Sequence, residues 1–184
     1  MDTDRADVAR QIGREPRAFN RVVVRCPFGR PAVTEQRAYD PDGEPFPTSY
    51  YVTCRHLVAA ISRIEAAGGV ERWTVAAQND PVLAASRTRA DDDQRALRHE
   101  LAAGETGRDG GASLELGVGG AGRTGSLKCL HAHAAFALAR PGYDLGDRIV
   151  AELDPLWPDQ LQRRAAFHPA AKSTWKLRFV KMES

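Results

Sequence analysis

The sequence predicts an α+β fold in a single domain, with a small antiparallel sheet packed by several helices. Three short stretches within residues 21–53 are rich in β-branched and aromatic residues and are separated by turn signals, a pattern typical of a small antiparallel sheet. Beyond them, apolar residues recur every three or four positions in several segments, which is the spacing of amphipathic helices. A chain of 184 residues fits one domain.

The first part of the chain is expected to form one helix and three strands. Residues 2–12 place Val8 and Ile12 at helical spacing among charged residues, so a short amphipathic helix is expected there. Glu15-Pro16 should end it, because the residue before a proline disfavours the helical conformation. Strands are expected at 21–26, 32–39 and 46–53, with turns at 27–31 and 40–43 between them.

The middle of the chain is expected to be helical. A helix beginning near Leu57 should end at Gly68-Gly69, and a second should span about 70–77. Asn79-Asp80-Pro81 should break that helix and start a third, with proline in its first turn, that runs to about residue 103. The charged stretch 87–100 of this third helix is expected to be a solvated face.

The last third begins with a glycine-rich segment. Residues 104–125 contain nine glycines and are expected to form a long loop, of the kind that is usually functional or mobile. Ser126 is expected to cap the helix that follows. Further elements are expected at 127–139 (helix), 145–153 (helix), 154–158 (rigid turn) and 174–180 (strand).

Composition and charge exclude several classes of protein. The chain has 26 basic and 24 acidic residues, and this balance indicates neither a nucleic-acid nor a membrane partner. The N-terminus lacks the apolar core of a signal peptide, and no apolar run approaches the roughly 20 residues that span a bilayer. A cytoplasmic location is therefore expected, where disulfides are uncommon, and three cysteines would leave one unpaired.

Three cysteines at junctions between expected elements are the best indication of function. Cys26 ends a strand, Cys54 precedes a helix, and Cys129 is expected in a first helical turn. Cysteine and histidine are ligands of zinc, and cysteine is the ligand of iron–sulfur clusters. On a regular helix Cys129 would share a face with His133, whereas a frayed first turn would bring it to His131. The alternative is that the cysteines are small buried apolar residues.

Four ordered motifs carry a resemblance to a known family. They are Arg25-Cys-Pro-Phe-Gly-Arg-Pro31, Phe46-Pro-Thr-Ser-Tyr-Tyr-Val-Thr-Cys54, Ser62-Arg-Ile-Glu65 and Lys128-Cys-Leu-His131. Together they resemble the bacterial domain of unknown function 501 family over about residues 20–155, with an N-terminal helix and a basic C-terminal tail appended.

This resemblance has implications for the metal and for partners. The family places cysteine or histidine at position 54, which implies a metal ligand. Its genes often lie beside those of a septum-formation-initiator-like protein and an exopolyphosphatase-type phosphatase, which implies a link to cell division. The chain departs from the family pattern at Arg55, where proline is usual.

The expected cofactor is zinc, and a [4Fe–4S] cluster is the alternative. Three cysteines and one histidine would complete a zinc tetrahedron, whereas three cysteines with an open position would suit a cluster. The candidate metal ligands are Cys26, Cys54, Cys129, His131 and His133.

The glycine-rich segment before Cys129 offers a second candidate site. Its backbone N–H groups, a following helix start and two cationic side chains would suit a phosphate or carboxylate. It is no Walker A motif, because lysine does not directly follow the last glycine. A flexible linker is the alternative. The candidate anion-binding residues are Gly119, Gly120, Arg123, Ser126 and Lys128.

Two functions from different classes follow. The first is a metal-dependent enzyme acting on a small anionic molecule, and the second is a non-enzymatic interaction protein with a structural metal. A third possibility is a nucleophilic Cys54 or Cys129, activated by a histidine and a helix N-terminus.

Overall fold

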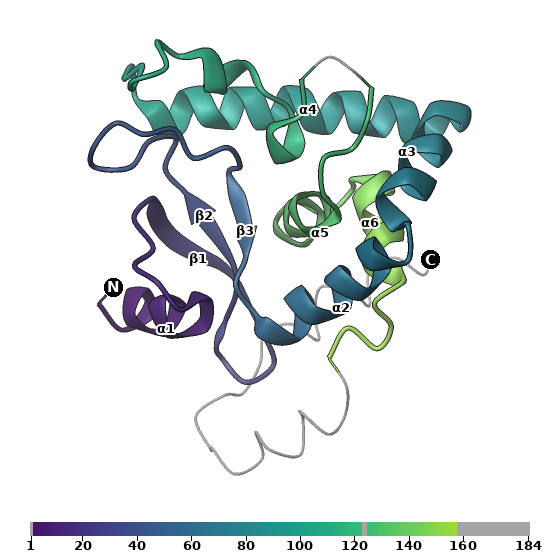
Figure 1. The fold of residues 1–184 in the computed structure, drawn as a ribbon, viewed down its shortest axis with the longest axis horizontal. Coiled ribbons are helices and arrows are strands. Elements are labelled where there is room, and N and C mark those ends of the chain that lie inside the picture. The colour runs from purple at the N-terminus through teal and green to yellow at the C-terminus, as the bar shows by residue number, and fades with distance from the viewer. Residues whose placement is uncertain (1, 123–124, 158–184) are drawn as a thin grey trace.

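The sheet lies between one helix on one face and a group of helices on the other. The computed structural model describes residues 2–122 and 125–157, and Figure 1 shows its six α-helices and three strands. The predicted α+β class, a small antiparallel sheet packed by helices, is confirmed. The predicted strand at 174–180 lies outside the described residues.

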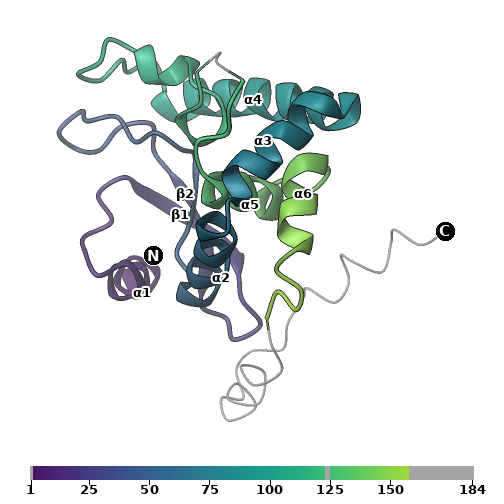
Figure 2. The ribbon, with the colours of Figure 1, turned by 45° about the vertical axis from the view of Figure 1, so that its right-hand side comes forward.

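The central strand of the sheet is buried along its whole length. Strands β1 (Phe19–Arg25), β2 (Pro31–Gln36) and β3 (Tyr50–Val52) pair antiparallel in the order β1-β2-β3. Every residue of β2 is buried, because α1 covers one face of the sheet and α5 the other (Figure 2). Even Glu35 is only 2% exposed, and its carboxylate accepts hydrogen bonds from Arg21 at 2.7 Å and Asn20 at 2.8 Å.

The predicted N-terminal helix is α1 (Asp2–Ile12). Val8 buries its side chain against the sheet, as the helical spacing of apolar residues requires. Polar contacts add to this packing, among them Arg55, which donates to the backbone oxygens of Arg10 and Gln11 at 2.8 and 2.9 Å. A cation at the C-terminal end of a helix stabilises the exposed carbonyls there, so the arginine at position 55 holds α1 in place.

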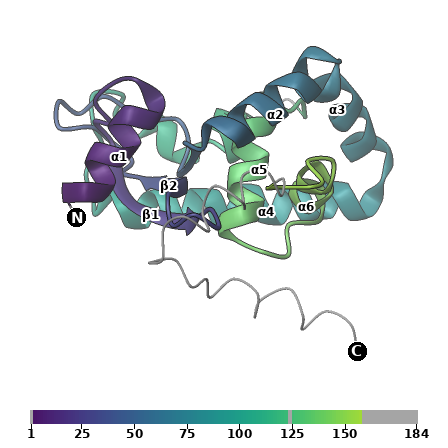
Figure 3. The same cartoon turned by 90° about the horizontal axis from the view of Figure 1, so that it is seen from below.

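Three consecutive helices form an arc around α5 and α6 (Figure 3). They are α2 (Arg55–Ala66), α3 (Gly69–Asn79) and α4 (Pro81–Ala102). Gly68 separates the first two with φ of 80°, a conformation that favours glycine. Asp80 caps α4 by accepting the N–H groups of Val82 and Leu83. Both breaks were predicted from these residue types.

The expectation that residues 87–100 of α4 form a solvated face is wrong for part of the stretch. Gln94 and Arg98 are fully buried. The guanidinium of Arg98 donates to the backbone oxygen of Phe46 at 2.6 Å and to that of Ser113 at 2.9 Å. Tertiary contacts are the reason. The segment after α4 folds back over the helix (Figure 1), and the Arg98 side chain holds it there through hydrogen bonds.

The glycine-rich segment is more ordered than an unstructured loop. It contains two short 3-10 helices, η1 (Ala112–Glu115) and η2 (Val118–Gly120). Arg87 of α4 donates to the backbone oxygens of Gly125 and Ser126, which fixes the end of the segment.

The helix predicted at 127–139 begins later than expected. Helix α5 spans Leu130–Ala139 and has Cys129 as its N-cap, so the expectation that Ser126 caps it is wrong. The backbone N–H of Leu127 instead donates to the hydroxyl of Thr74 at 3.1 Å, which keeps the chain extended up to Cys129.

Helix α5 is the centre of the molecule, and α6 (Asp144–Ala151) packs against it. Seven of its ten residues are buried, so it is apolar on all sides. A Cβ atom at Gly146 of α6 would lie 2.7 Å from that of Ala137, which shows how closely the two helices approach. None of the helices within the described ranges is long and apolar enough to cross a membrane.

Candidate metal centre

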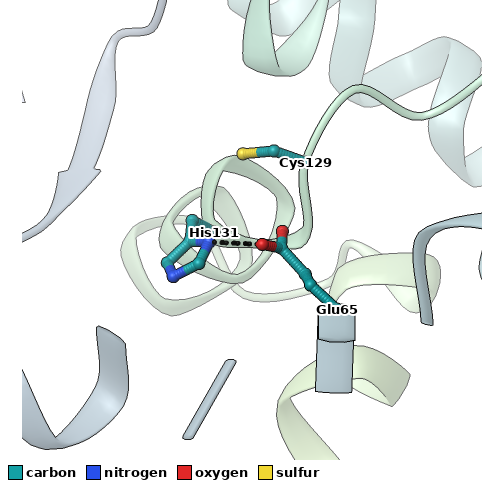
Figure 4. Close-up of side chains that lie close together, drawn as sticks. All are labelled: Glu65, Cys129 and His131. Atoms are coloured by element: carbon teal, nitrogen blue, oxygen red, sulfur yellow. Dashed lines mark ion pairs between the residues drawn. The ribbon is translucent and has the colours of Figure 1, made fainter. Parts of the chain in front are cut away.

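Three side chains with metal-binding atoms meet where the end of α2 faces the start of α5 (Figure 4). They are Glu65, Cys129 and His131, and their ligand atoms all lie within 4.8 Å of one another. The side chains of Glu65 and His131 are each 24% exposed, so the group is partly buried but open to solvent.

Cys129 is placed by its role as the N-cap of α5. Its backbone is extended, with φ of −159° and ψ of 143°, and its Sγ accepts the backbone N–H of Ala132 at 3.4 Å. An N-cap side chain normally satisfies one of the free N–H groups in the first helical turn, and a thiol performs that role here.

Glu65 reaches the same helix start from the last turn of α2. Its Oε1 accepts the backbone N–H of Leu130 at 2.5 Å, and its Oε2 lies 3.2 Å from Nδ1 of His131. A carboxylate at a helix N-terminus is stabilised by the free N–H groups and the positive end of the helix dipole. Glu65 therefore links α2 to α5.

His131 is held through both of its ring nitrogens. Its Nε2 lies 3.2 Å from the backbone oxygen of Val58, and a carbonyl can only accept, so this nitrogen carries a proton. Figure 4 shows Nδ1 directed toward Glu65 and the other nitrogen directed away. The hydrogen bond with Cys129 is the main cause of the raised pKa of His131, and Glu65 adds to it, although burial acts in the opposite direction.

The three side chains are of the types that zinc uses as ligands. Thiolate, imidazole and carboxylate are all zinc ligands. Metal-bound histidines usually donate their other N–H to a carbonyl or carboxylate, as His131 does to Val58. Each candidate ligand thus has a backbone partner that fixes its orientation.

Two of the predicted metal ligands lie elsewhere. Among the described residues, Glu65, Cys129 and His131 are the only group of three with this spacing, and neither Cys26 nor Cys54 belongs to it. Cys26 is buried, and Cys54 is the N-cap of α2 with no side-chain cap hydrogen bond. Both cysteines pack on the main hydrophobic core, as expected for small apolar side chains.

His133, the other predicted ligand, points into the core. It is fully buried, and its Nδ1 lies 2.7 Å from the hydroxyl of Tyr143. Burial, with a smaller effect of Arg87, lowers the pKa of His133 to about 3. The pairing of Cys129 with His131 rather than His133 follows from the position of Cys129 outside the helix, where the spacing of a regular helix does not apply.

Glu65 is the residue that sequence reasoning did not assign to the metal. An acidic residue in the last turn of a helix opposes the helix dipole, so its presence at the end of α2 was a signal that it serves another group. The signal was incomplete, because the partner lies more than sixty positions away, at Leu130.

The predicted anion site is arranged differently. Gly119 and Gly120 both have φ near 70°, at 72° and 73°, and lie in η2. The N–H of Gly120 donates to Gly117 at 3.0 Å, and the N–H of Val118 donates to the carboxylate of Asp91 at 2.8 Å. The N–H of Val118 is therefore already occupied by a carboxyl side chain of α4.

Two of the remaining predicted anion-binding residues precede the first turn of α5. Ser126 and Lys128 are exposed and precede α5, so Lys128 is not in its first turn. Arg123 lies outside the described residues. The N–H groups of Leu130 and Ala132 donate to Glu65 and Cys129.

Comparison with known proteins identifies a family for this chain but does not identify a function. The family model described as a protein of unknown function (DUF501) matches residues 22–151. No curated protein matches the chain, and no solved structure matches it. The matched range includes Glu65, Cys129 and His131 and excludes α1.

Proposed function

The chain belongs to the DUF501 family, whose function is unknown, and we propose that it binds one zinc ion through Glu65, Cys129 and His131. The observation that carries this proposal is the convergence of the three ligand atoms within 4.8 Å. The backbone contact made by Val58 supports it, because it leaves Nδ1 of His131 as the nitrogen that faces the other two ligands.

The ligand set favours zinc over an iron–sulfur cluster. A [4Fe–4S] cluster is held by several cysteine thiolates, whereas a single cysteine belongs to this group. Sulfur, nitrogen and oxygen ligands together suit zinc. Zinc binds cysteine as the thiolate and histidine as the neutral imidazole, so zinc uptake should release protons.

Three protein ligands suit a catalytic zinc better than a structural one. Structural zinc sites have four protein ligands, whereas catalytic sites keep one position for water or substrate. When bound, zinc would polarise a substrate oxygen and activate a water molecule. Lys128, which precedes Cys129 and is exposed, would attract an anionic substrate to this position. We therefore propose an enzyme that acts on a small anionic molecule.

Zinc binding can be tested on the metal-free full-length chain with matched variants. We expect one zinc ion per chain in a titration against a chromophoric chelator. Cys129→Ser, His131→Ala and Glu65→Gln should each weaken binding by roughly tenfold or more. Cys54→Ser is the matched control, because Cys54 is also a half-buried helix N-cap, and it should bind zinc like the unchanged chain.

Cobalt substitution tests the ligands directly. A bound Co²⁺ should give a thiolate charge-transfer band that is lost in Cys129→Ser and kept in Cys54→Ser. Absence of stoichiometric metal binding, or equal binding by all variants, would refute the proposal.

A test for an open coordination position distinguishes a catalytic zinc from a closed structural metal. Addition of phosphate or thiocyanate should change the visible spectrum of the Co²⁺ protein if one coordination site accepts an external ligand. An unchanged spectrum at saturating anion would favour the alternative, an interaction protein with a structural metal.

A second candidate function uses Cys129 as a nucleophile. The observation that favours it is the position of the thiol at a helix N-terminus beside His131, an arrangement that activates cysteines. Metal-free protein should then react with iodoacetamide faster at Cys129 than at Cys54, and His131→Ala should remove the difference. Equal rates at the two cysteines would exclude this function.

A further inference from the structure

A cavity lies at the opposite end of α5 from the candidate metal centre. It has a volume of about 380 Å³, within the range of pockets that hold small molecules. It is bounded by α4, the end of α5 and the connection to α6. Its inner surface is formed by Ala90, Phe136 and Tyr143, all of them buried, so the interior suits an apolar group.

One polar group in the cavity wall has no partner. Ser86 lines the cavity and is only 2% exposed, and its hydroxyl makes no hydrogen bond within the described part of the chain. A buried polar atom without a partner costs free energy. The oxygen lies behind the cavity surface, so a ligand would reach it only after a small movement of the wall.

The rim of the cavity carries one charge of each sign that belongs to no ion pair within the described residues. Arg140 and Asp93 both line it and are exposed, and within the described residues neither has an ion-pair partner. The Nε of Arg140 donates to the hydroxyl of Tyr50 at 3.3 Å, which orients the guanidinium. By contrast, the other two charged residues of the rim, Arg89 and Asp92, are already paired, with Asp144 and Arg95 respectively.

From these features we propose that the cavity binds a free α-amino acid with an apolar side chain. The carboxylate of the ligand would contact Arg140, because a guanidinium binds carboxylates through two parallel hydrogen bonds. Its ammonium would contact Asp93, and its side chain would fill the space against Phe136 and Tyr143. A ligand that carries both charges would pair with both rim side chains, whereas a simple anion or cation would pair with only one of them.

Three related probes separate the contributions to binding. L-Phenylalanine carries both charged groups, 3-phenylpropionate lacks the ammonium, and 2-phenylethylamine lacks the carboxylate. By calorimetric titration of the full chain, we expect saturable binding of L-phenylalanine, with each of the other two weaker by roughly tenfold or more. Absence of saturable binding for all three, or stronger binding of a singly charged probe, would overturn the proposal.

Variants that remove a charge test which side chain of the rim contacts the carboxylate of the ligand and which contacts its ammonium. Arg140→Ala should weaken L-phenylalanine and 3-phenylpropionate and leave 2-phenylethylamine unchanged. Asp93→Asn should weaken L-phenylalanine and 2-phenylethylamine and leave 3-phenylpropionate unchanged. The controls are Arg30→Ala and Glu71→Gln, which remove the same charges from exposed positions that do not line the cavity, and they should bind all probes like the unchanged chain. Equal effects of a cavity variant and its control would overturn the proposal.

The hydroxyl of Ser86 provides an independent readout. Because it has no partner in the unliganded chain, Ser86→Ala should melt at the same or a higher temperature than the unchanged chain. The same variant should gain less thermal stabilisation from saturating L-phenylalanine. An equal thermal stabilisation of Ser86→Ala and the unchanged chain would show that Ser86 does not contact the ligand. If Asp93→Asn also bound L-phenylalanine normally, the cavity would be refuted as the binding place.

Discussion

Replacing Glu65 by alanine removes two contacts between α2 and α5 in the metal-free protein. The first is the hydrogen bond from the backbone N–H of Leu130 to Oε1, at 2.5 Å, and the second is the pair between Oε2 and Nδ1 of His131, at 3.2 Å. Both contacts lie at the start of the central helix, so their loss should lower the stability of the whole fold.

The size of the effect follows from the two contacts. A hydrogen bond to a charged group is worth about 1.5 kcal/mol at the low end, and this end applies because Glu65 is 24% exposed. A partly exposed ion pair adds about 0.5 kcal/mol. For a chain of this length, the sum of about 2 kcal/mol should lower the melting temperature by about 4–8 °C.

Thermal unfolding followed by circular dichroism, in the presence of a chelator, measures this directly. Glu65→Gln keeps an acceptor for Leu130 but loses the charge, so its melting temperature should fall by about half as much. Glu105→Ala serves as a control, because it removes the same side chain from an exposed position. A melting temperature for Glu65→Ala within the error of that control would refute the helix-linking role of Glu65.

Three further perturbations test the packing around α4 and α5. Gly146→Ala should destabilise the fold by about 1–3 kcal/mol in urea unfolding, because the added Cβ would lie 2.4 Å from the ring of Tyr143; Gly122→Ala, where the space is open, should not. Arg98→Lys should cost about 2 kcal/mol in the same assay, because an ammonium cannot replace a guanidinium that donates to two carbonyls; a cost under about 0.5 kcal/mol would contradict the anchoring role. Asp91→Asn should raise the melting temperature at neutral pH. Burial raises the pKa of the Asp91 carboxyl, so the protein loses stability as pH rises and this group ionises, and asparagine does not ionise. The gain should shrink toward about pH 4, and a gain that is independent of pH would contradict this reasoning.

The elements that local chemistry defines could be predicted from the sequence. Asp80-Pro81 marks the start of α4, and Gly68 separates α2 from α3, because capping side chains and left-handed glycines act within a few residues. The start of α5 was placed three residues too early, since serine is a preferred N-cap and cysteine is not. The burial of Arg98 could not be predicted, because it depends on a segment that folds back from later in the chain.

The candidate metal centre shows the same division between local and distant contacts. Cys129 and His131 are two residues apart, and their convergence at an irregular helix start was one of the alternatives that the spacing left open. Glu65 comes from another helix, so only the packing of α2 on α5 could bring it to the site. Cys26 and Cys54 share the residue type of a ligand, but their places in the fold leave them outside the group.

The contacts of Arg55 lie partly outside the range that the family model matches. Arg55 donates to the last carbonyls of α1, and α1 precedes that range. A proline, which the resemblance implies at this position, would have no donor for those carbonyls.

Helix α5 has only ten residues, which corresponds to a length of about 15 Å. The two proposed sites lie at its opposite ends, with Cys129 before the first turn and Arg140 after the last. Closely packed protein interiors have low compressibility and transmit strain. A shift of α5 caused by an occupant at one end would therefore also be felt by the residues at the other end.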